Sequence, residues 1–159
     1  DKKFKKIYSI TITLKRFKYV LKEVKKMFNI IKAGGGVVQN KSDQILFIYR
    51  QKKWDLPKGG IEKNELIIEA AQREVKEETG VADLIVIDKI GETYHIFNNG
   101  KTYRLKRTYW FRMRSDYKGE LMPQEEEGIT SVEWISKKRI SKILENAYEN
   151  IKGIVSEVI

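Results

Sequence analysis

The sequence predicts an α/β fold in which helices pack on a mixed β-sheet. Strand-like runs are interspersed with segments of helical periodicity, without the regular alternation of a fully parallel sheet. Two of the strand-like runs flank Asn98-Asn99-Gly100, and Asn-Gly is a strong signal for a β-hairpin. A chain of 159 residues is long enough for one domain with a single core.

Residues 1–28 are expected to form a basic β-α extension that packs on or next to the core. Residues 6–13 alternate like a strand, and residues 14–28 place apolar side chains at helical spacing. Residues 1–32 carry eleven Lys and Arg against two acidic residues, so the rest of this +10 chain is nearly neutral. A solvated helix face is the favoured interpretation of this charge, and contact with a polyanion is the alternative.

Residues 29–159 are expected to form the main domain. Its predicted strands are, in order, 33–38, 44–50, 85–97, 101–114 and 131–136. The glycines at 34–36 indicate close packing in a sheet, because no helix with Gly-Lys-Thr/Ser follows them as in a phosphate-binding loop. A last helix is expected over 137–151.

The strongest helix is predicted over 65–79, with Asn64 as N-cap and Gly80 as the residue that ends it. On a helical wheel its buried stripe contains Ile67, Ile68, Ala71 and Val75. Three carboxylates border this stripe near the C-terminal end: Glu74, Glu77 and Glu78. Acidic groups are unfavourable at a helix C-terminus, but a divalent cation such as Mg²⁺ would reverse that effect and prefers oxygen ligands. An ordinary acidic surface helix is the alternative.

The segment "LPKGG" directly before this helix is expected to be a loop. Pro57 stiffens it, Gly59 and Gly60 permit close backbone contacts, and Lys58 supplies a cation. The loop could therefore reach the same metal and phosphate as the carboxylates.

Residues 59–81 resemble the signature of the Nudix hydrolase family. That signature is Gly, five residues, Glu, seven residues, then Arg-Glu-aliphatic-any-Glu-Glu-any-Gly-aliphatic. The matching residues are Gly59, Glu65, Arg73, Glu74, Val75, Glu77, Glu78, Gly80 and Val81. Every fixed position matches, and residues 1–28 lie outside the resemblance.

The resemblance implies an α/β/α sandwich with a central mixed sheet, and Mg²⁺- or Mn²⁺-dependent hydrolysis of a nucleoside diphosphate linked to another group. Carried over by position, Glu77 and Glu78 are metal ligands, and Glu74 is a metal ligand or the general base. Arg73 orients one of these carboxylates, and the backbone carbonyl of Lys58 is a further ligand. We refer below to Glu74, Glu77 and Glu78 as the box carboxylates.

Relatives of this family also recruit a carboxylate from a loop after the hairpin. "PQEEEGI" offers Glu125, Glu126 and Glu127, and Glu126 is the candidate for catalysis, although the pattern does not choose among the three. A solvated turn is the alternative interpretation. Lys58, Gly59, Gly60 and Arg112 are the candidates for substrate binding.

"WDLPKGG" resembles the subgroup that acts on diadenosine or diphosphoinositol polyphosphates. Several cations could bind such a substrate: Lys58, Arg104, Lys106, Arg112 and Arg114. Several aromatic residues could stack on a base, although packing in the core or at its rim is the favoured interpretation for each: Trp54, Tyr94, Tyr103 and Trp110. His95, the one histidine, is assigned no catalytic role.

The expected function is therefore a pyrophosphohydrolase acting on a nucleotide or polyphosphate, with a dinucleoside polyphosphate as one candidate. The alternatives are a nucleoside triphosphate or RNA-end pyrophosphohydrolase, and a non-catalytic nucleotide- or nucleic-acid-binding regulator. Nucleic acid is the less favoured partner, and a homodimer is a further expectation. No apolar run reaches the length of a membrane span and no signal peptide is recognised. The sequence has no cysteine, which fits the expected cytoplasmic location.

Overall fold

The computed structural model describes residues 17–98, 100 and 102–159. The strand expected at 6–13 lies outside these residues. The first described element is helix α1 (Phe17–Lys26), which begins three residues later and ends two residues earlier than expected. The division of the chain at residue 28 remains a prediction.

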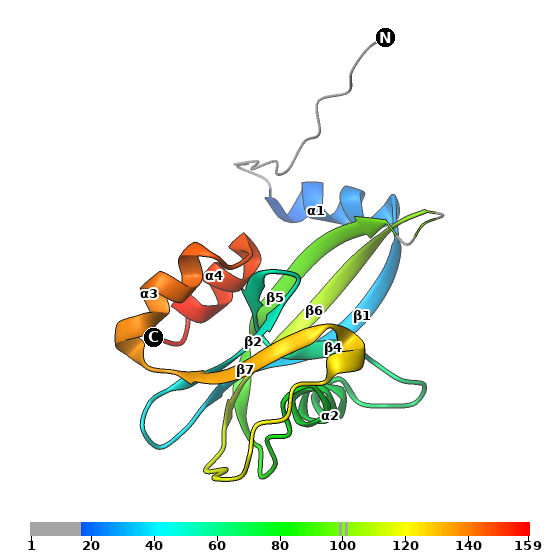
Figure 1. The fold of residues 1–159 in the computed structure, drawn as a ribbon. Coiled ribbons are helices and arrows are strands. Elements are labelled where there is room, and N and C mark those ends of the chain that lie inside the picture. Colours follow the sequence, from blue (N-terminus) through cyan, green and yellow to red (C-terminus); the bar gives the residue numbers. More distant parts are fainter. Residues whose placement is uncertain (1–16, 99, 101) are drawn as a thin grey trace.

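Seven strands of the described residues form one curled mixed sheet (Figure 1). They are β1 (Asn29–Gln39), β2 (Ile45–Arg50), β3 (Lys53–Asp55), β4 (Lys58–Gly60), β5 (Ile85–Asn98), β6 (Tyr103–Arg114) and β7 (Ile129–Ile135). The main path runs β3-β2-β1-β6-β5, with β4 paired to β1 and β7 to β2. Strands β1 and β6 are parallel and the other pairs are antiparallel, so the predicted mixed sheet and the β5–β6 hairpin are confirmed.

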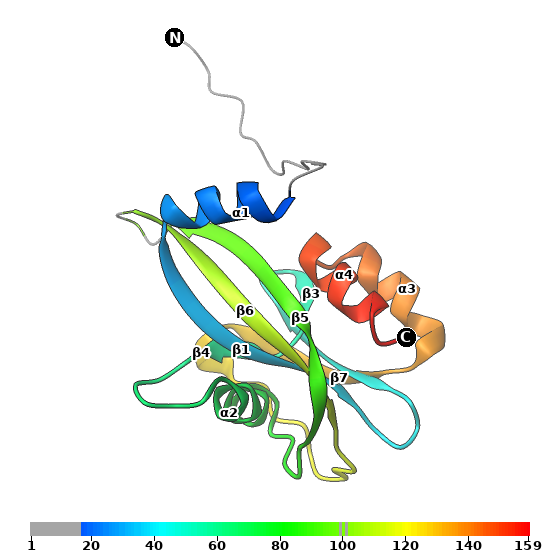
Figure 2. The ribbon, with the colours of Figure 1, turned by 180° about the vertical axis from the view of Figure 1, so that it is seen from behind.

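Helices cover both faces of the sheet (Figures 1 and 2). Helix α2 (Ile67–Thr79) packs on one face through Ala71 and Val75, which share a core with Val38 and Met113. Helices α3 (Lys137–Glu145) and α4 (Glu149–Ser156) pack on the other face in a second core around Trp110. The two cores make the predicted α/β/α sandwich, which is confirmed.

The triple glycine lies in β1 and permits the close packing that the sequence predicted. A Cβ on Gly34 would lie 2.7 Å from the backbone nitrogen of Ala71. A Cβ on Gly36 would lie 2.8 Å from the side chain of Val75. Helix α2 therefore approaches the sheet more closely than side chains on these residues would allow.

The start of α2 differs from the sequence prediction. The N-cap is Leu66, whereas Asn64 adopts a left-handed conformation with φ of 67° in the preceding turn. The Glu69 carboxylate accepts a hydrogen bond from the Leu66 N–H at 3.1 Å and caps the helix from inside its first turn. Ile68 is 38% exposed, so its assignment to the buried stripe was wrong. Gly80 ends the helix as predicted, with φ of 75°.

Two other expectations are corrected by long-range pairing. The segment "LPKGG" contains strand β4 instead of being a plain loop, because β4 pairs with β1. The single helix expected over 137–151 is divided at Asn146. This residue leaves the helix to accept a hydrogen bond from the Trp54 N–H at 3.0 Å and to donate one to the Lys52 carbonyl at 2.9 Å.

Within the described part of the chain, no helix combines the length and apolar character that crossing a membrane requires.

Candidate active site

Arg73 connects the box carboxylates to the segment before the helix. Its Nε lies 2.7 Å from Glu65 Oε1, and its Nη1 lies 2.8 Å from both Glu74 Oε1 and Glu77 Oε2. Its Nη2 donates a 2.8 Å hydrogen bond to the Gly60 carbonyl. The hydrogen bond to Glu65, followed by those to Glu74 and Glu77, raises the pKa of Arg73. One permanently charged guanidinium therefore fixes two box carboxylates against β4.

Glu74 lies directly over Gly59. A Cβ on Gly59 would lie 1.9 Å from Glu74 Oε2, so no larger residue fits there without moving the carboxylate. The Glu74 side chain is 13% exposed, and burial raises its pKa against the opposing effect of Arg73. The glycine of the predicted motif thus provides the space in which this carboxylate lies.

Glu78 is the most buried of the box carboxylates, with 1% of its surface exposed. Its Oε2 accepts a 2.8 Å hydrogen bond from the Lys58 backbone N–H, and its Oε1 lies 3.6 Å from Arg50 Nη1. Burial raises the pKa of Glu78 to about 7, although the charges of Lys58 and Arg50 act in the opposite direction. A carboxylate in this environment gains free energy from any further positive charge brought close to it.

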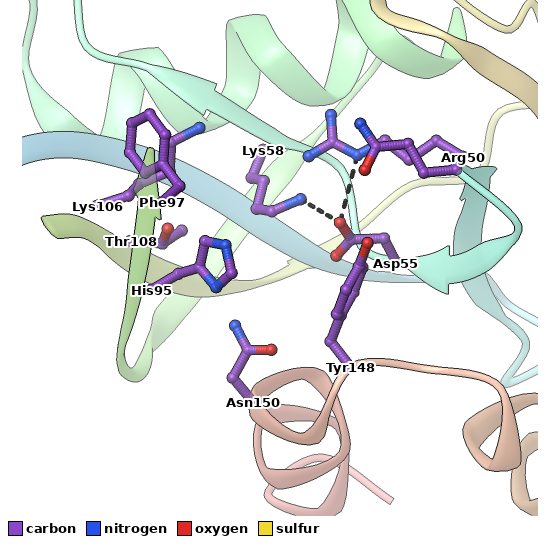
Figure 3. Close-up of a pocket in the computed structure, with 10 residues that line it drawn as sticks. Arg50, Asp55, Lys58, His95, Phe97, Lys106, Thr108, Tyr148 and Asn150 are labelled. Carbon is purple, nitrogen blue, oxygen red and sulfur yellow. Dashed lines mark hydrogen bonds and ion pairs between the residues drawn. The ribbon is translucent and has the colours of Figure 1, made fainter. Parts of the chain in front are cut away.

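Asp55 holds the Lys58 side chain beside this carboxylate. Lys58 Nζ lies 2.5 Å from Asp55 Oδ2, and Arg50 Nε lies 3.4 Å from the same oxygen (Figure 3). Both Asp55 and Lys58 are buried. Arg50 thus spans two carboxylates, those of Asp55 and Glu78, and the four side chains form one buried ionic network.

Three members of this network, Arg50, Asp55 and Lys58, line a cavity of about 240 Å³. Its lining residues are Arg50, Gln51, Asp55, Lys58, His95, Phe97, Lys106, Thr108, Tyr148 and Asn150 (Figure 3). Lys106 extends from β6, and burial together with the charges of Lys58 and Arg50 lowers its pKa. Three cations against one lining carboxylate make the cavity suited to an anionic ligand.

The predicted site residues are not all brought together. Arg112 lies outside the cavity lining, with Nε 3.4 Å from Asp88 Oδ1 and Nη2 3.4 Å from the Glu157 carbonyl. Gly60 is exposed at the end of β4, where its carbonyl accepts from Arg73.

The acidic loop after the hairpin lies beside the C-terminal end of α2. Glu125, Glu126 and Glu127 form one 3-10 turn, η1 (Glu125–Glu127), whose side chains are exposed. The Gln124 N–H before it is 3.4 Å from the Glu78 carbonyl. The negative charge of Glu127 contributes to raising the pKa of Glu74.

The aromatic candidates named from the sequence lie elsewhere. Trp110 is fully buried, and Trp54 packs against Phe47 and Tyr49. Tyr94 lies against Lys25 and Arg107, and Tyr103 is exposed outside the cavity.

The cavity is instead lined by Phe97 and Tyr148, which the sequence reasoning missed, and by His95, to which it assigned no catalytic role. The alternation that places His95 and Phe97 on one face of β5 could have indicated two of them. Arg50 and Asp55 were also missed. The pairing of Arg50 with Glu78 depends on a long-range contact, whereas Asp55 pairs with Lys58 only three residues later in the chain.

Together these observations describe an α/β/α protein with carboxylates at one helix end and a cationic cavity beside them. The sequence profile of the NUDIX domain matches residues 31–156, and the chain belongs to the Nudix family. The predicted assignment to the Nudix hydrolases is confirmed at the level of the family.

Two curated relatives illustrate the sequence similarity. An RNA pyrophosphohydrolase of Pelagibacter ubique is 28% identical over 145 residues, which cover 79% of this chain and 90% of the relative. An RNA pyrophosphohydrolase of Bartonella henselae is 35% identical over 77 residues, which cover 43% of each chain. The chain therefore spans less than half the length of the Bartonella relatives that it matches.

Solved structures share the fold. A C. elegans Ap4A hydrolase in a binary complex aligns with a TM-score of 0.62 and 18% identity, over 80% of this chain and 93% of that chain. A bifunctional NMN adenylyltransferase/ADP ribose pyrophosphatase from Francisella tularensis, complexed with AMP and an Mn ion, aligns with a TM-score of 0.61 and 21% identity. That alignment covers 88% of this chain and 44% of the Francisella chain. The subgroup suggested by "WDLPKGG" is not singled out by these relatives.

Proposed function

We propose that this protein is a divalent-metal-dependent pyrophosphohydrolase that cleaves a phosphoanhydride bond in a nucleoside diphosphate linked to another group. The observation that carries the proposal is the junction of β4 with the end of α2. There the Lys58 N–H is bonded to buried Glu78, while the Lys58 ammonium and Arg50 line the adjacent cavity. Carboxylates for a metal and cations for phosphate thus lie side by side.

The box carboxylates fit a hard divalent ion by their donor chemistry. In residues 17–98, 100 and 102–159, no three acidic or histidine side chains already lie together as a metal-binding group. Glu77 is paired with Arg73, but its side chain is 46% exposed and can rotate without disturbing the core. Carboxylate oxygens are ligands that Mg²⁺ and Mn²⁺ prefer. Glu77 and Glu78 would hold the ion with the Lys58 carbonyl as a further ligand, and Glu74 would be a third carboxylate ligand or the general base.

A bound Mg²⁺ or Mn²⁺ would supply Lewis acidity toward phosphate oxygens and lower the pKa of a coordinated water. The chain itself would bind the phosphates through Lys58, Arg50 and Lys106. The water oxygen would form a new bond to phosphorus, and the bridging P–O bond would break with its electron pair leaving on the departing phosphate. A carboxylate would accept the proton from the water.

Two carboxylates compete for that proton-accepting role. Glu74 lies over Gly59, and its raised pKa makes it a better base than an ordinary glutamate. Among the acids of η1, Glu127 is the one whose negative charge raises the pKa of both Glu74 and Lys106. We therefore place Glu127 ahead of Glu126 as the alternative base.

Two substrate classes are consistent with the cavity. A dinucleoside polyphosphate would match its several cations, and an Ap4A hydrolase shares the fold. An RNA 5′ end is the second candidate, because the curated relatives are RNA pyrophosphohydrolases. The homodimer and the cytoplasmic location remain predictions.

The test is a panel of dinucleoside polyphosphates, nucleoside triphosphates, nucleotide sugars, diphosphoinositols and 5′-triphosphorylated RNA, incubated with Mg²⁺ or with EDTA. We expect hydrolysis of at least one phosphoanhydride substrate with Mg²⁺ and none with EDTA. Product identification will show which phosphorus is attacked. Binding of these compounds without any turnover would support the non-catalytic regulator instead.

A further inference from the structure

Two aromatic rings stand parallel in the wall of the cavity. His95 and Phe97 are two residues apart on β5, so their side chains extend from the same face of the sheet. Their ring planes differ by 4°, and the ring centroids are 6.5 Å apart. Both rings line the cavity described above (Figure 3).

The spacing of these rings suits the insertion of a third flat ring. Stacked carbon atoms are in contact at about 3.5 Å, so a ring between two others needs about 7 Å in all. The centroid distance of 6.5 Å is the largest separation that the two ring planes can have, so the planes must move apart by at least about 0.5 Å to admit a third ring. The side chain of His95 is exposed and can rotate to widen the gap. The Asn150 amide of α4 lines the same cavity near His95 and offers both a donor and an acceptor to the edge of an inserted ring (Figure 3).

The charges beside the rings indicate what such a ring must carry. Lys106 is directly opposite His95 in the β5–β6 pairing, and its Nζ lies 5.7 Å from the centroid of the Phe97 ring. Lys58 and Arg50 line the same cavity closer to the box carboxylates. A ligand with a flat heterocycle at one end and phosphates at the other would match both parts of the cavity.

We propose that His95 and Phe97 form a clamp for the nucleobase of the substrate, with the phosphates directed toward Lys106, Lys58 and Arg50. This inference rests on the proposed function and narrows it. It favours a nucleoside polyphosphate over a diphosphoinositol polyphosphate, which has no flat ring to insert.

The test compares the binding of ADP with that of inorganic pyrophosphate by titration calorimetry in EDTA, where no hydrolysis is required. The variants His95→Ala and Phe97→Leu remove one ring each, and Phe97→Tyr retains the ring. Stacking of a base on an aromatic residue is worth about 1–3 kcal/mol by alanine substitution, which corresponds to roughly a 5- to 150-fold change in affinity. We expect His95→Ala and Phe97→Leu to weaken ADP binding at least about fivefold. We expect Phe97→Tyr to bind ADP with the wild-type affinity, because it retains the ring.

Pyrophosphate affinity should change less than about twofold in all three variants, because pyrophosphate has no base to stack. Tyr103→Ala is the matched control, since Tyr103 is 63% exposed on the same hairpin and outside the cavity lining. The clamp is refuted if the wild-type protein does not bind ADP, or if both ring-removing variants bind ADP with the wild-type affinity. It is also refuted if these variants lose affinity for ADP and for pyrophosphate to the same extent. If ADP binding behaves as expected but the panel shows no turnover, the clamp stands and the proposed hydrolase fails.

Discussion

The backbone N–H of Lys58 donates a 2.8 Å hydrogen bond to the side chain of Glu78, 20 residues later in the chain. This bond joins β4 to the C-terminal end of α2. It explains why Glu78 can remain buried at a helix end where the dipole is unfavourable, since a backbone donor and the charges of Lys58 and Arg50 offset part of the cost. The same contact sets the metal-binding candidates beside the phosphate-binding candidates.

Substitution of Gly59 by alanine should displace Glu74. The added Cβ would overlap the carboxylate, which lies only 1.9 Å from the Cβ position. We expect the free energy of unfolding to fall by about 1–3 kcal/mol, measured by urea denaturation. Gly60→Ala is the matched control, because a Cβ there meets nothing within 4 Å, and it should change stability by less than about 0.5 kcal/mol. Equal stability of the two variants would show that Glu74 does not lie over Gly59.

Asp55→Asn should destabilise the buried ionic network. The substitution leaves the Lys58 ammonium, whose side chain is 9% exposed, without its carboxylate partner. Removing one member of a buried pair costs about 3–5 kcal/mol, and we expect a loss near the lower end because Asn retains a hydrogen-bond acceptor. The control Asp116→Asn removes an exposed pair with Lys41 and should change the unfolding free energy by less than about 1 kcal/mol. A loss of the same small size for Asp55→Asn would exclude the network as a source of stability.

Glu92, which lies away from the candidate site, should make a pH-dependent contribution to the free energy of unfolding. Burial alone would raise its pKa, but hydrogen bonds from Lys89, Tyr94 and Arg107 outweigh burial and lower the pKa to about 2. Because this is below the ordinary value of 4.5, the contribution is complete above pH 4.5 and declines as the pH falls from there toward 2.

The measurement for Glu92 is urea denaturation of wild type and Glu92→Gln at pH 7 and pH 3. At pH 7 the variant should be less stable by roughly 1–2 kcal/mol, discounted because the site is partly solvated. The difference should shrink at pH 3. Glu149→Gln, which affects a largely exposed pair with Lys152, should show little change at either pH. If the difference in unfolding free energy between wild type and Glu92→Gln is the same at pH 7 and pH 3, the lowered pKa of Glu92 is contradicted.

The sequence predicts those elements of the fold that follow from local periodicity and turn signals. It does not predict features that depend on contacts between residues far apart in the chain. Periodicity located the long strands and α2, and the glycine signal correctly placed the end of α2 at Gly80. The break between α3 and α4 was missed because it follows from the contact of Asn146 with Lys52 and Trp54, about 90 residues earlier in the chain. Neither residue can be recognised as a partner from local pattern.

The same distinction applies to the candidate site. The spacing of the box carboxylates is a local property of one helix, so it was visible in the sequence. The pairing of Arg50 with Asp55 and Glu78 requires the turn between β2 and β3 and the packing of α2, which no local pattern specifies. The favoured packing role of the two tryptophans is confirmed, because Trp110 is fully buried and Trp54 packs against Phe47 and Tyr49.

The central claim is that the box carboxylates support metal-dependent hydrolysis. Its most direct test is the rate of Mg²⁺-dependent hydrolysis by Glu77→Gln, with Glu145→Gln on α3 as the matched exposed control. We predict that Glu77→Gln loses at least about tenfold in rate, while its unfolding free energy changes by less than about 1 kcal/mol, because the side chain is 46% exposed. The control should retain the wild-type rate. Undiminished Mg²⁺-dependent hydrolysis by Glu77→Gln would contradict the assignment.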